Sequence, residues 1–182
     1  MKIAPDNELL QYSGRIDFEV QTAPVFVYAG SFVKIKFRGA CISADITNHR
    51  SYATNYLGYI LDGKQGKFVL TQNDKPHTYT IGKRLTEGEH ELLLFKRMDS
   101  CHYFTFHGFV MEEEGEILPL QDKPQRRIEV FGDSVSCGEV SEALHYVGKE
   151  DPKHDGEFSN SWYSYSWITA RKLNAELHIT AQ

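Results

Sequence analysis

The chain is 182 residues long, which is enough for one ordinary domain, or for one domain and part of another. Its composition, 41% hydrophobic and 25% charged, is typical of a globular protein and excludes a disordered chain. The net charge of −5 gives no electrostatic reason to expect nucleic acid as a partner. No apolar run is long enough to predict a membrane span.

The cysteines and the N-terminus bear on the compartment in which the protein works. Cys41, Cys101 and Cys137 form neither a CxxC pair nor a Cys/His ligand pattern, so no structural zinc site is predicted. Three reduced, partly buried thiols suit a reducing compartment. Residues 1–6 lack the apolar segment of a signal peptide, which predicts a cytoplasmic protein, or a secreted one if a signal has been trimmed.

The pattern of residues 15–117 predicts a series of short strands separated by turns. The runs typical of strands are 16–20, 25–28, 32–37, 56–61, 67–71, 91–96 and 103–110. From Val33 to Phe37 the residues alternate, which places two lysines on one face and apolar side chains on the other. Many short strands without a convincing helix among them predict an antiparallel β-sandwich, of the jelly-roll type, over residues 1–120.

The pattern changes after a polar segment, residues 121–127, which is predicted to be a linker. A strand–helix–strand unit, the opening of a parallel-sheet α/β domain, is predicted over residues 128–182. Its expected parts are a strand at 128–131, a loop at 138–160, a helix at 161–174 and a strand at 177–180. Residues spaced to share one face of the helix are Tyr163, Trp167, Ala170 and Leu173.

The candidate catalytic residues lie where the first of these strands ends, at Gly132-Asp133-Ser134. Gly132 permits a tight bend and a close backbone approach. The carboxyl end of a strand is where open α/β sheets bind ligands, and backbone N–H groups of the following turn can stabilise a developing oxyanion. Gly-Asp-Ser is also common turn chemistry, so the triplet alone does not establish Ser134 as a nucleophile.

A longer segment carries a resemblance to a known family. Residues 126–138, Arg-Arg-Ile-Glu-Val-Phe-Gly-Asp-Ser-Val-Ser-Cys-Gly, closely resemble the first signature block of the GDSL-like, or SGNH, hydrolases. Within that superfamily the chain looks most like carbohydrate esterase family 2, whose members pair an N-terminal jelly roll with a C-terminal SGNH hydrolase domain. Further segments similar to that family are residues 14–17, 29–31, 37–40, 59–63, 88–90, 96–97 and 160–175.

The resemblance implies an acetyl xylan esterase-like carbohydrate O-acetylesterase, whose partner is an acetylated plant polysaccharide or oligosaccharide of the xylan or mannan type. Ser134 would attack the acetyl carbonyl, form an acetyl-enzyme and donate its own backbone N–H to the oxyanion, with no metal or organic cofactor. Gly132 and Asp133 would support the turn without acting as acid or base. The oligomeric state is not predicted.

The remaining machinery of such hydrolases does not map onto this chain. It comprises a Gly after the second strand and an Asn side chain, both oxyanion donors, and a base His near the C-terminus. The histidines that follow Ser134 here are His145 and His154, in the predicted loop, and His178, in the second strand. A loop histidine could reach the site, whereas His178 is expected to be structural. Without a base Ser134 is a poor nucleophile, so an inactive fragment is expected.

Two non-catalytic functions remain open for the predicted sandwich. It could be a carbohydrate-binding module in which exposed rings stack on sugars. Candidates for such rings are Tyr52, Tyr56, Trp162 and Tyr163. It could instead be a scaffold that binds no glycan and packs against the hydrolase domain.

Overall fold

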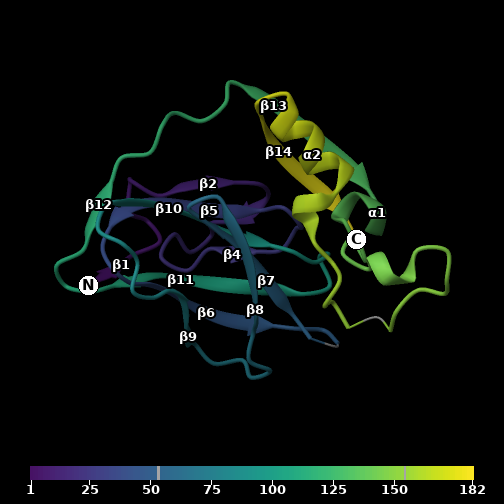
Figure 1. Ribbon diagram of the computed structural model, residues 1–182, viewed down its shortest axis with the longest axis horizontal. Helices are drawn as coiled ribbons and strands as arrows, with labels where there is room; N and C mark the ends of the chain where they lie inside the picture. Colours follow the sequence, from purple (N-terminus) through teal and green to yellow (C-terminus); the bar gives the residue numbers. More distant parts are fainter. Residues whose placement is uncertain (53, 154) are drawn as a thin grey trace.

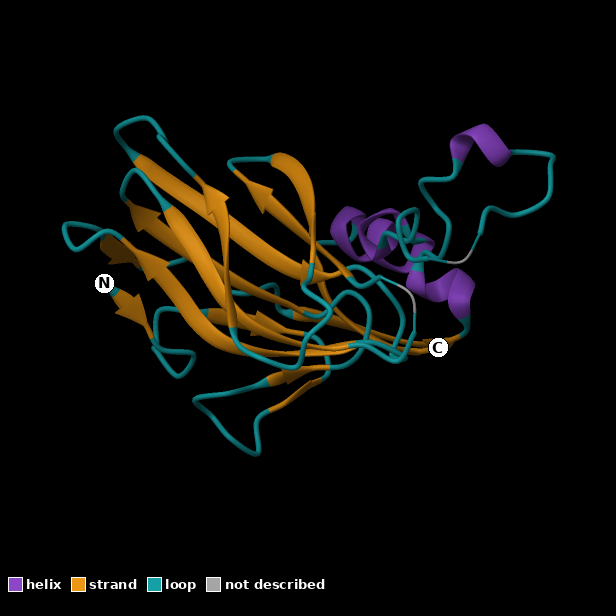
Figure 2. Cartoon of the chain, turned by 90° about the horizontal axis from the view of Figure 1, so that it is seen from below, coloured by secondary structure: helices purple, strands orange, loops and turns teal. Residues whose placement is uncertain are grey.

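The computed structural model describes residues 1–52, 54–153 and 155–182. Two antiparallel sheets are stacked as a sandwich, and a small parallel sheet with its helices packs at one end of it (Figure 1). Figure 2 shows the helices gathered at that end, beyond the strands of the sandwich. No helix in the described residues is long and apolar enough to cross a membrane.

Each layer of the sandwich is a six-stranded antiparallel sheet. The first has the strand order β3-β4-β11-β6-β9, with β1 paired to β11. Its strands are β1 (Lys2–Ile3), β3 (Ile16–Asp17), β4 (Val25–Phe26), β6 (Ile42–His49), β9 (His77–Gly82) and β11 (Tyr103–Met111). The second has the order β12-β5-β10-β7-β8, with β2 paired to β5. Its strands are β2 (Gln11–Ser13), β5 (Phe32–Arg38), β7 (Tyr56–Leu61), β8 (Lys64–Val69), β10 (Glu89–Lys96) and β12 (Glu116–Leu118).

The β-sandwich predicted from the sequence is confirmed, with changes in the bounds of its strands. β7 has the expected bounds, whereas the runs predicted over residues 16–20 and 25–28 are paired only in their first two residues. β6 and β9 were not among the runs singled out from the sequence. Polar side chains fill many of their positions, so their apolar signal is weak.

Alternation in β5 decides which of its residues form the core. Every second residue from Val33 to Phe37 is fully buried, as predicted. The lysines between them face outward, and Lys34 pairs with Glu91 of the neighbouring strand β10 at 2.7 Å. One face of the strand is therefore committed to the core and the other to solvent and cross-strand ion pairs.

The C-terminal residues form the predicted strand–helix–strand unit. β13 (Arg126–Gly132) and β14 (Ala175–Ala181) pair in parallel along their whole length. Between them lie α1 (Ser134–Cys137), η1 (Leu144–Tyr146), η2 (Ser161–Tyr163) and α2 (Tyr165–Lys172). Pairing starts at the first residue of β13, so the regular strand extends into the segment predicted as a linker over residues 121–127.

The predicted helix begins later and ends earlier than expected, and only half of its expected face is buried. The Ser164 side chain accepts a hydrogen bond from the Trp167 N–H (3.2 Å) and caps the start of α2. Tyr163 therefore lies before the helix and is 48% exposed, and Leu173 follows it and is 47% exposed. Trp167 and Ala170, the other two residues of that face, are buried.

A second hydrophobic core joins the sandwich to the C-terminal unit. Phe95, near the end of β10, is fully buried and packs against Trp162 and edge-on against Trp167, with ring centroids 5.9 and 5.2 Å apart. Phe32 of β5 stacks parallel to Trp167 at 6.0 Å. Buried residues that complete this core are Ala29, Cys137, Ala170, Leu177, Ile179 and Ala181. The two parts of the molecule are thus held by shared apolar burial.

Truncating Phe95 tests this shared core. Phe95→Ala removes a fully buried ring from between two tryptophans and should lower the free energy of unfolding by about 3–5 kcal/mol. Phe131→Ala is the matched control, because the Phe131 ring is 69% exposed, and it should cost about 0.5 kcal/mol or less. Urea unfolding followed by tryptophan fluorescence measures both values. Equal losses in the two variants would contradict the shared core.

Candidate active site

Ser134 lies where the parallel sheet ends and the first helical turn begins. β13 ends at Gly132, Asp133 is the N-cap of α1, and Ser134 is the first residue of that helix. The Asp133 side chain accepts a hydrogen bond from the Val135 N–H at 3.1 Å. Ser134 is half-buried and Asp133 is exposed. The turn therefore presents Ser134 at the carboxyl end of β13, and the Asp133 carboxylate is engaged in holding that turn.

Two glycines allow the close packing around this turn. A Cβ atom on Gly132 would collide with the Ser136 side chain. Gly138 ends α1 with φ 76°, and a Cβ atom there would lie 2.5 Å from the Asn160 carbonyl oxygen. The Asn160 N–H donates back to the Gly138 carbonyl at 2.9 Å. The loop between these two residues therefore starts and ends beside the Ser134 turn.

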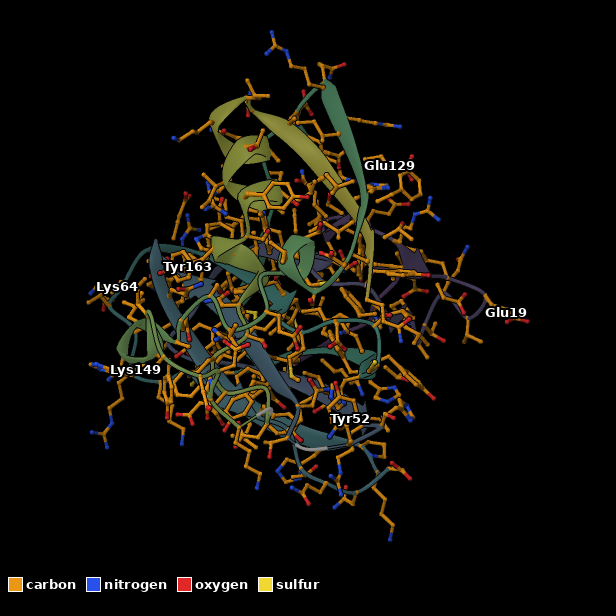
Figure 3. All side chains as sticks on the ribbon, turned by 90° about the vertical axis from the view of Figure 1, so that its right-hand side faces the viewer. Glu19, Tyr52, Lys64, Glu129, Lys149 and Tyr163 are labelled. Atoms are coloured by element: carbon orange, nitrogen blue, oxygen red, sulfur yellow. The ribbon has the colours of Figure 1, made fainter. Side chains whose placement is uncertain are left out.

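A cavity of about 390 Å³ opens beside Ser134. Its lining residues are Ser134, Val135, Gly138, Glu139, Val140, Ser141, Asp151, Tyr163, Ser164 and Tyr165. Figure 3 looks onto this side of the molecule and labels Tyr163. In residues 1–52, 54–153 and 155–182 no histidine lines the cavity. The cavity thus supplies hydroxyls, two carboxylates and two aromatic rings, but none of these described groups is an imidazole.

The histidines that follow Ser134 do not meet it in the described structure. His145 is exposed in η1. His178 lies in β14 opposite Glu129 of β13 and lines a separate hollow beside β3. His154 lies outside the described residues. The positions of His145 and His178 therefore support neither as the partner of Ser134.

The aromatic residues considered for sugar stacking have different surroundings. Tyr163 lines the Ser134 cavity. Trp162 packs against the second core. Tyr52 is 41% exposed and lies 4.8 Å from the His102 ring, and the Lys67 ammonium lies 5.7 Å from the centre of the Tyr56 ring. Tyr163 is the one of these four rings that shares a cavity with Ser134.

Glu142 ties the loop after Ser134 to the sandwich. Its carboxylate accepts hydrogen bonds from Arg97 (2.7 Å), Lys67 (3.2 Å) and Asn160 (2.6 Å). Arg97 follows β10 and is 1% exposed, Lys67 lies in β8, and Asn160 is fully buried at the far end of the loop. We call these four residues the Glu142 anchor. Two cations from the sandwich thus hold the loop at Glu142, the residue that follows Ser141 of the cavity lining.

The protonation of Glu142 follows from these contacts. Burial opposes ionisation of its carboxyl group, but hydrogen bonds from Arg97 and Asn160 outweigh burial and hold its pKa below the ordinary value. Glu142 is therefore ionised at neutral pH, and the buried Arg97 guanidinium keeps its counter-ion.

The thiols and potential metal ligands of the chain form no further site in the described structure. Cys41, Cys101 and Cys137 are all free. Burial raises the pKa of Cys137, three residues after Ser134, to about 12, so this residue is a thiol and not a competing nucleophile. No group of three or more His, Cys, Asp or Glu side chains among the described residues is arranged to hold a metal ion.

Sequence reasoning singled out the Ser134 turn but missed the groups that hold it in place. These are the Glu142 anchor and a hydrogen bond of 2.8 Å between the Ser136 and Tyr165 hydroxyls, which links α1 to α2. Arg97 and Asn160 lay in segments similar to the esterase family, so two of the four anchor residues carried a signal. Glu142 lies in a loop without periodicity, and only the folded chain identifies its partners.

A family model and a solved structure at 30% identity name the same family. Residues 12–120 match the family described as carbohydrate esterase 2 N-terminal. The cellulase/esterase CelE of Acetivibrio thermocellus is 33% identical over 177 residues, and an acetylxylan esterase / glucomannan deacetylase of Cellvibrio japonicus is 25% identical over 177 residues. The solved structure of a family two carbohydrate esterase from Clostridium thermocellum in complex with cellohexaose matches with a TM-score of 0.83 at 30% identity.

These proteins are longer than the chain described above. The two curated relatives match 97% of this chain, which spans 21% and 47% of their respective lengths. The solved esterase matches 94% of this chain, which spans 50% of that structure.

Replacing the central carboxylate tests the Glu142 anchor. Glu142→Gln leaves the buried Arg97 cation without a counter-ion and should lower the free energy of unfolding at pH 7 by about 1–3 kcal/mol. Because the pKa of Glu142 is lowered on folding, the wild-type advantage is complete above the unfolded carboxyl pKa of about 4.3 and disappears as pH falls through the lower folded value.

Urea unfolding of both proteins between pH 7 and pH 3 measures this difference. Glu150→Gln is the matched control, since Glu150 is an exposed carboxylate of the same loop, and it should change stability by about 0.5 kcal/mol or less. A wild-type advantage that persists unchanged at low pH would contradict the assignment of the stabilising charge to Glu142.

Proposed function

Because this chain belongs to carbohydrate esterase family 2, we propose that it is the front part of a two-domain carbohydrate O-acetylesterase with Ser134 as nucleophile. The observation that carries the proposal is the place of Ser134, at the carboxyl end of a parallel strand, on a capped turn and in a cavity. Its substrate is an acetylated xylan- or mannan-type polysaccharide or oligosaccharide. The description of one relative as an acetylxylan esterase / glucomannan deacetylase supports this substrate class.

The proposed reaction is acyl transfer through Ser134. Its hydroxyl oxygen attacks the acetyl carbonyl carbon, loses its proton to a base and forms a tetrahedral oxyanion. The Ser134 backbone N–H is one donor to that oxyanion. Collapse breaks the bond to the sugar oxygen, which leaves as the sugar hydroxyl after taking the proton. Water then adds to the acetyl-enzyme and releases acetate, which restores the Ser134 hydroxyl.

The neighbouring residues have positioning roles in this scheme. Asp133 caps α1, and Gly132 leaves room for the Ser136 side chain, so the turn is fixed before substrate binds. We assign residues 1–120 to the sandwich domain, 121–127 to the connection, and 128–182 to the first part of an SGNH hydrolase domain. The parallel pairing of β13 and β14 supports the separate α/β unit, whose first strand begins at Arg126, two residues before the assigned boundary.

The chain alone is proposed to be nearly inactive. The Ser134 cavity has no histidine in its described lining, and the chain spans about half or less of its relatives. A base and further oxyanion donors are assigned to a continuation of the hydrolase domain. The exposed outer face of β13, where Phe131 is 69% exposed, supports such a continuation, because parallel sheets are covered on both faces.

For the sandwich we favour the scaffolding role, in which it packs against the hydrolase domain, over glycan binding by the exposed rings of the sandwich alone. Arg97 and Lys67 of the sandwich bind Glu142, which directly follows Ser141 in the lining of the Ser134 cavity, and this contact supports that choice. The sandwich would then act by holding the loop that shapes the catalytic pocket.

Activity measurements with a matched pair of serine variants test the nucleophile. The chain should be continued with the C-terminal half of the solved family two esterase, which by the family resemblance is expected to supply the base. In that protein Ser134→Ala should lower kcat for 4-nitrophenyl acetate by at least about 1,000-fold. Ser141 also lines the cavity and serves as the control. The kcat of the Ser141→Ala variant should stay within about tenfold of that of the parent. Equal activity of the Ser134→Ala variant and the parent would refute the role of Ser134.

The proposed inactivity has its own measurement. The 182-residue chain should hydrolyse 4-nitrophenyl acetate no faster than its Ser134→Ala variant, because a serine without a base is a poor nucleophile. Turnover that Ser134→Ala abolishes would show that this chain already contains a base.

A further inference from the structure

A second cavity, of about 590 Å³, lies between the sandwich and the C-terminal unit. One wall comes from β2, β5 and β10, another from α2 and β14, and a third from residues 121–125. It shares no lining residue with the Ser134 cavity. We call it the Arg171 pocket, after the cation that lines it from α2.

Arg171 lies over the ring of a tryptophan. Its guanidinium carbon lies 3.8 Å from the centre of the Trp162 ring, and Nη1 donates a hydrogen bond to the Trp162 carbonyl oxygen at 2.8 Å. Trp162 is itself packed against Trp167 at 4.7 Å. Stacking and the hydrogen bond fix the guanidinium plane before any ligand arrives, which lowers the entropy lost on binding.

Arg171 is also a cation without an acidic partner within the described residues. The pocket's lysines are compensated, since Lys34 pairs with Glu91 (2.7 Å) and Lys123 with Glu176 (3.3 Å). The Arg171 guanidinium has one hydrogen bond, to a carbonyl, and no ion pair in the part of the chain that the structure describes. Partial burial lowers its pKa from the ordinary value. The pocket is also lined by two carboxylates, Asp122 and Glu176, but among the described residues neither forms an ion pair with Arg171. An entering anion would supply the counter-charge at Arg171 that they do not.

We propose that the Arg171 pocket binds a sugar acid, a pyranose ring with a carboxylate, as a unit of an oligosaccharide. The carboxylate accepts two parallel hydrogen bonds from Arg171. The ring's C–H groups contact the apolar part of the lining, to which Phe32 and Leu93 belong. The need for an anion comes from the pocket itself, whereas the choice of a sugar over other carboxylic acids rests on the proposed carbohydrate function.

Fluorescence titration of the 182-residue chain tests this site. Both tryptophans of the chain, Trp162 and Trp167, line the pocket, so their emission reports its occupancy. The probes are a xylo-oligosaccharide with one glucuronic acid branch, the same oligosaccharide without the branch, free glucuronic acid and inorganic phosphate. The acidic oligosaccharide should saturate the signal with a Kd at least about tenfold below that of the neutral one. Free glucuronic acid should compete with it, and phosphate should bind more weakly than either acid.

Two neighbouring cations of α2 provide matched variants. Arg171→Gln should weaken binding of the acidic oligosaccharide at least about tenfold. Lys172, like Arg171, is exposed, but it does not line the pocket, so Lys172→Gln removes the same charge and should leave the Kd unchanged. Arg171→Lys keeps the charge but loses the planar fork, and it should weaken binding severalfold. It serves as the test if circular dichroism shows Arg171→Gln to be unfolded.

The outcomes separate this site from the esterase. Ser134→Ala should bind the acidic oligosaccharide like the wild type, so loss of esterase activity and loss of binding are independent results. Equal affinity for the neutral oligosaccharide, equal affinity for phosphate, or equal loss in the Arg171→Gln and Lys172→Gln variants would each overturn the proposal.

Discussion

The end of β10 is the point on which the rest of the structure depends, because it holds the C-terminal unit by two kinds of interaction at once. Phe95 buries its ring against both tryptophans, and two residues later Arg97 pairs with the Glu142 carboxylate. Between these contacts Ser161 donates its hydroxyl to the Lys96 carbonyl at 2.7 Å. Apolar burial supplies stability there, and the directional polar contacts select one orientation.

A two-stranded parallel sheet cannot be stable by itself, so β13 and β14 need this contact. One face of the pair is covered by α2 and by the sandwich through the second core. The other face carries exposed Phe131, and Glu129 with its ion-pair partner Arg15 of the sandwich. The position of Ser134 at the end of β13 is therefore set by packing against the sandwich, and the sandwich is part of what shapes the site.

The sequence predicted those elements whose signal lies within a few consecutive residues. Alternation in β5 and the Gly132-Asp133-Ser134 turn were both visible, because strand periodicity and turn chemistry are local properties. The sequence could not show that Ser164 would start α2 late and leave Tyr163 outside it, because many serines precede helices without capping them. Nor did it show that Arg97 and Glu142, 45 residues apart, would meet.

Thus the sequence by itself determined the β-sandwich and the strand–helix–strand unit after it, since both follow from short patterns of residue type. It also determined the esterase family, through the segments that resemble that family. Only the tertiary structure decided which groups surround Ser134 and that Arg171 would lie stacked on Trp162 beside a cavity. The physical reason is that ion pairs, stacked rings and cavities join residues distant in the chain. Their distances depend on how the sheets and helices pack, which no local pattern encodes.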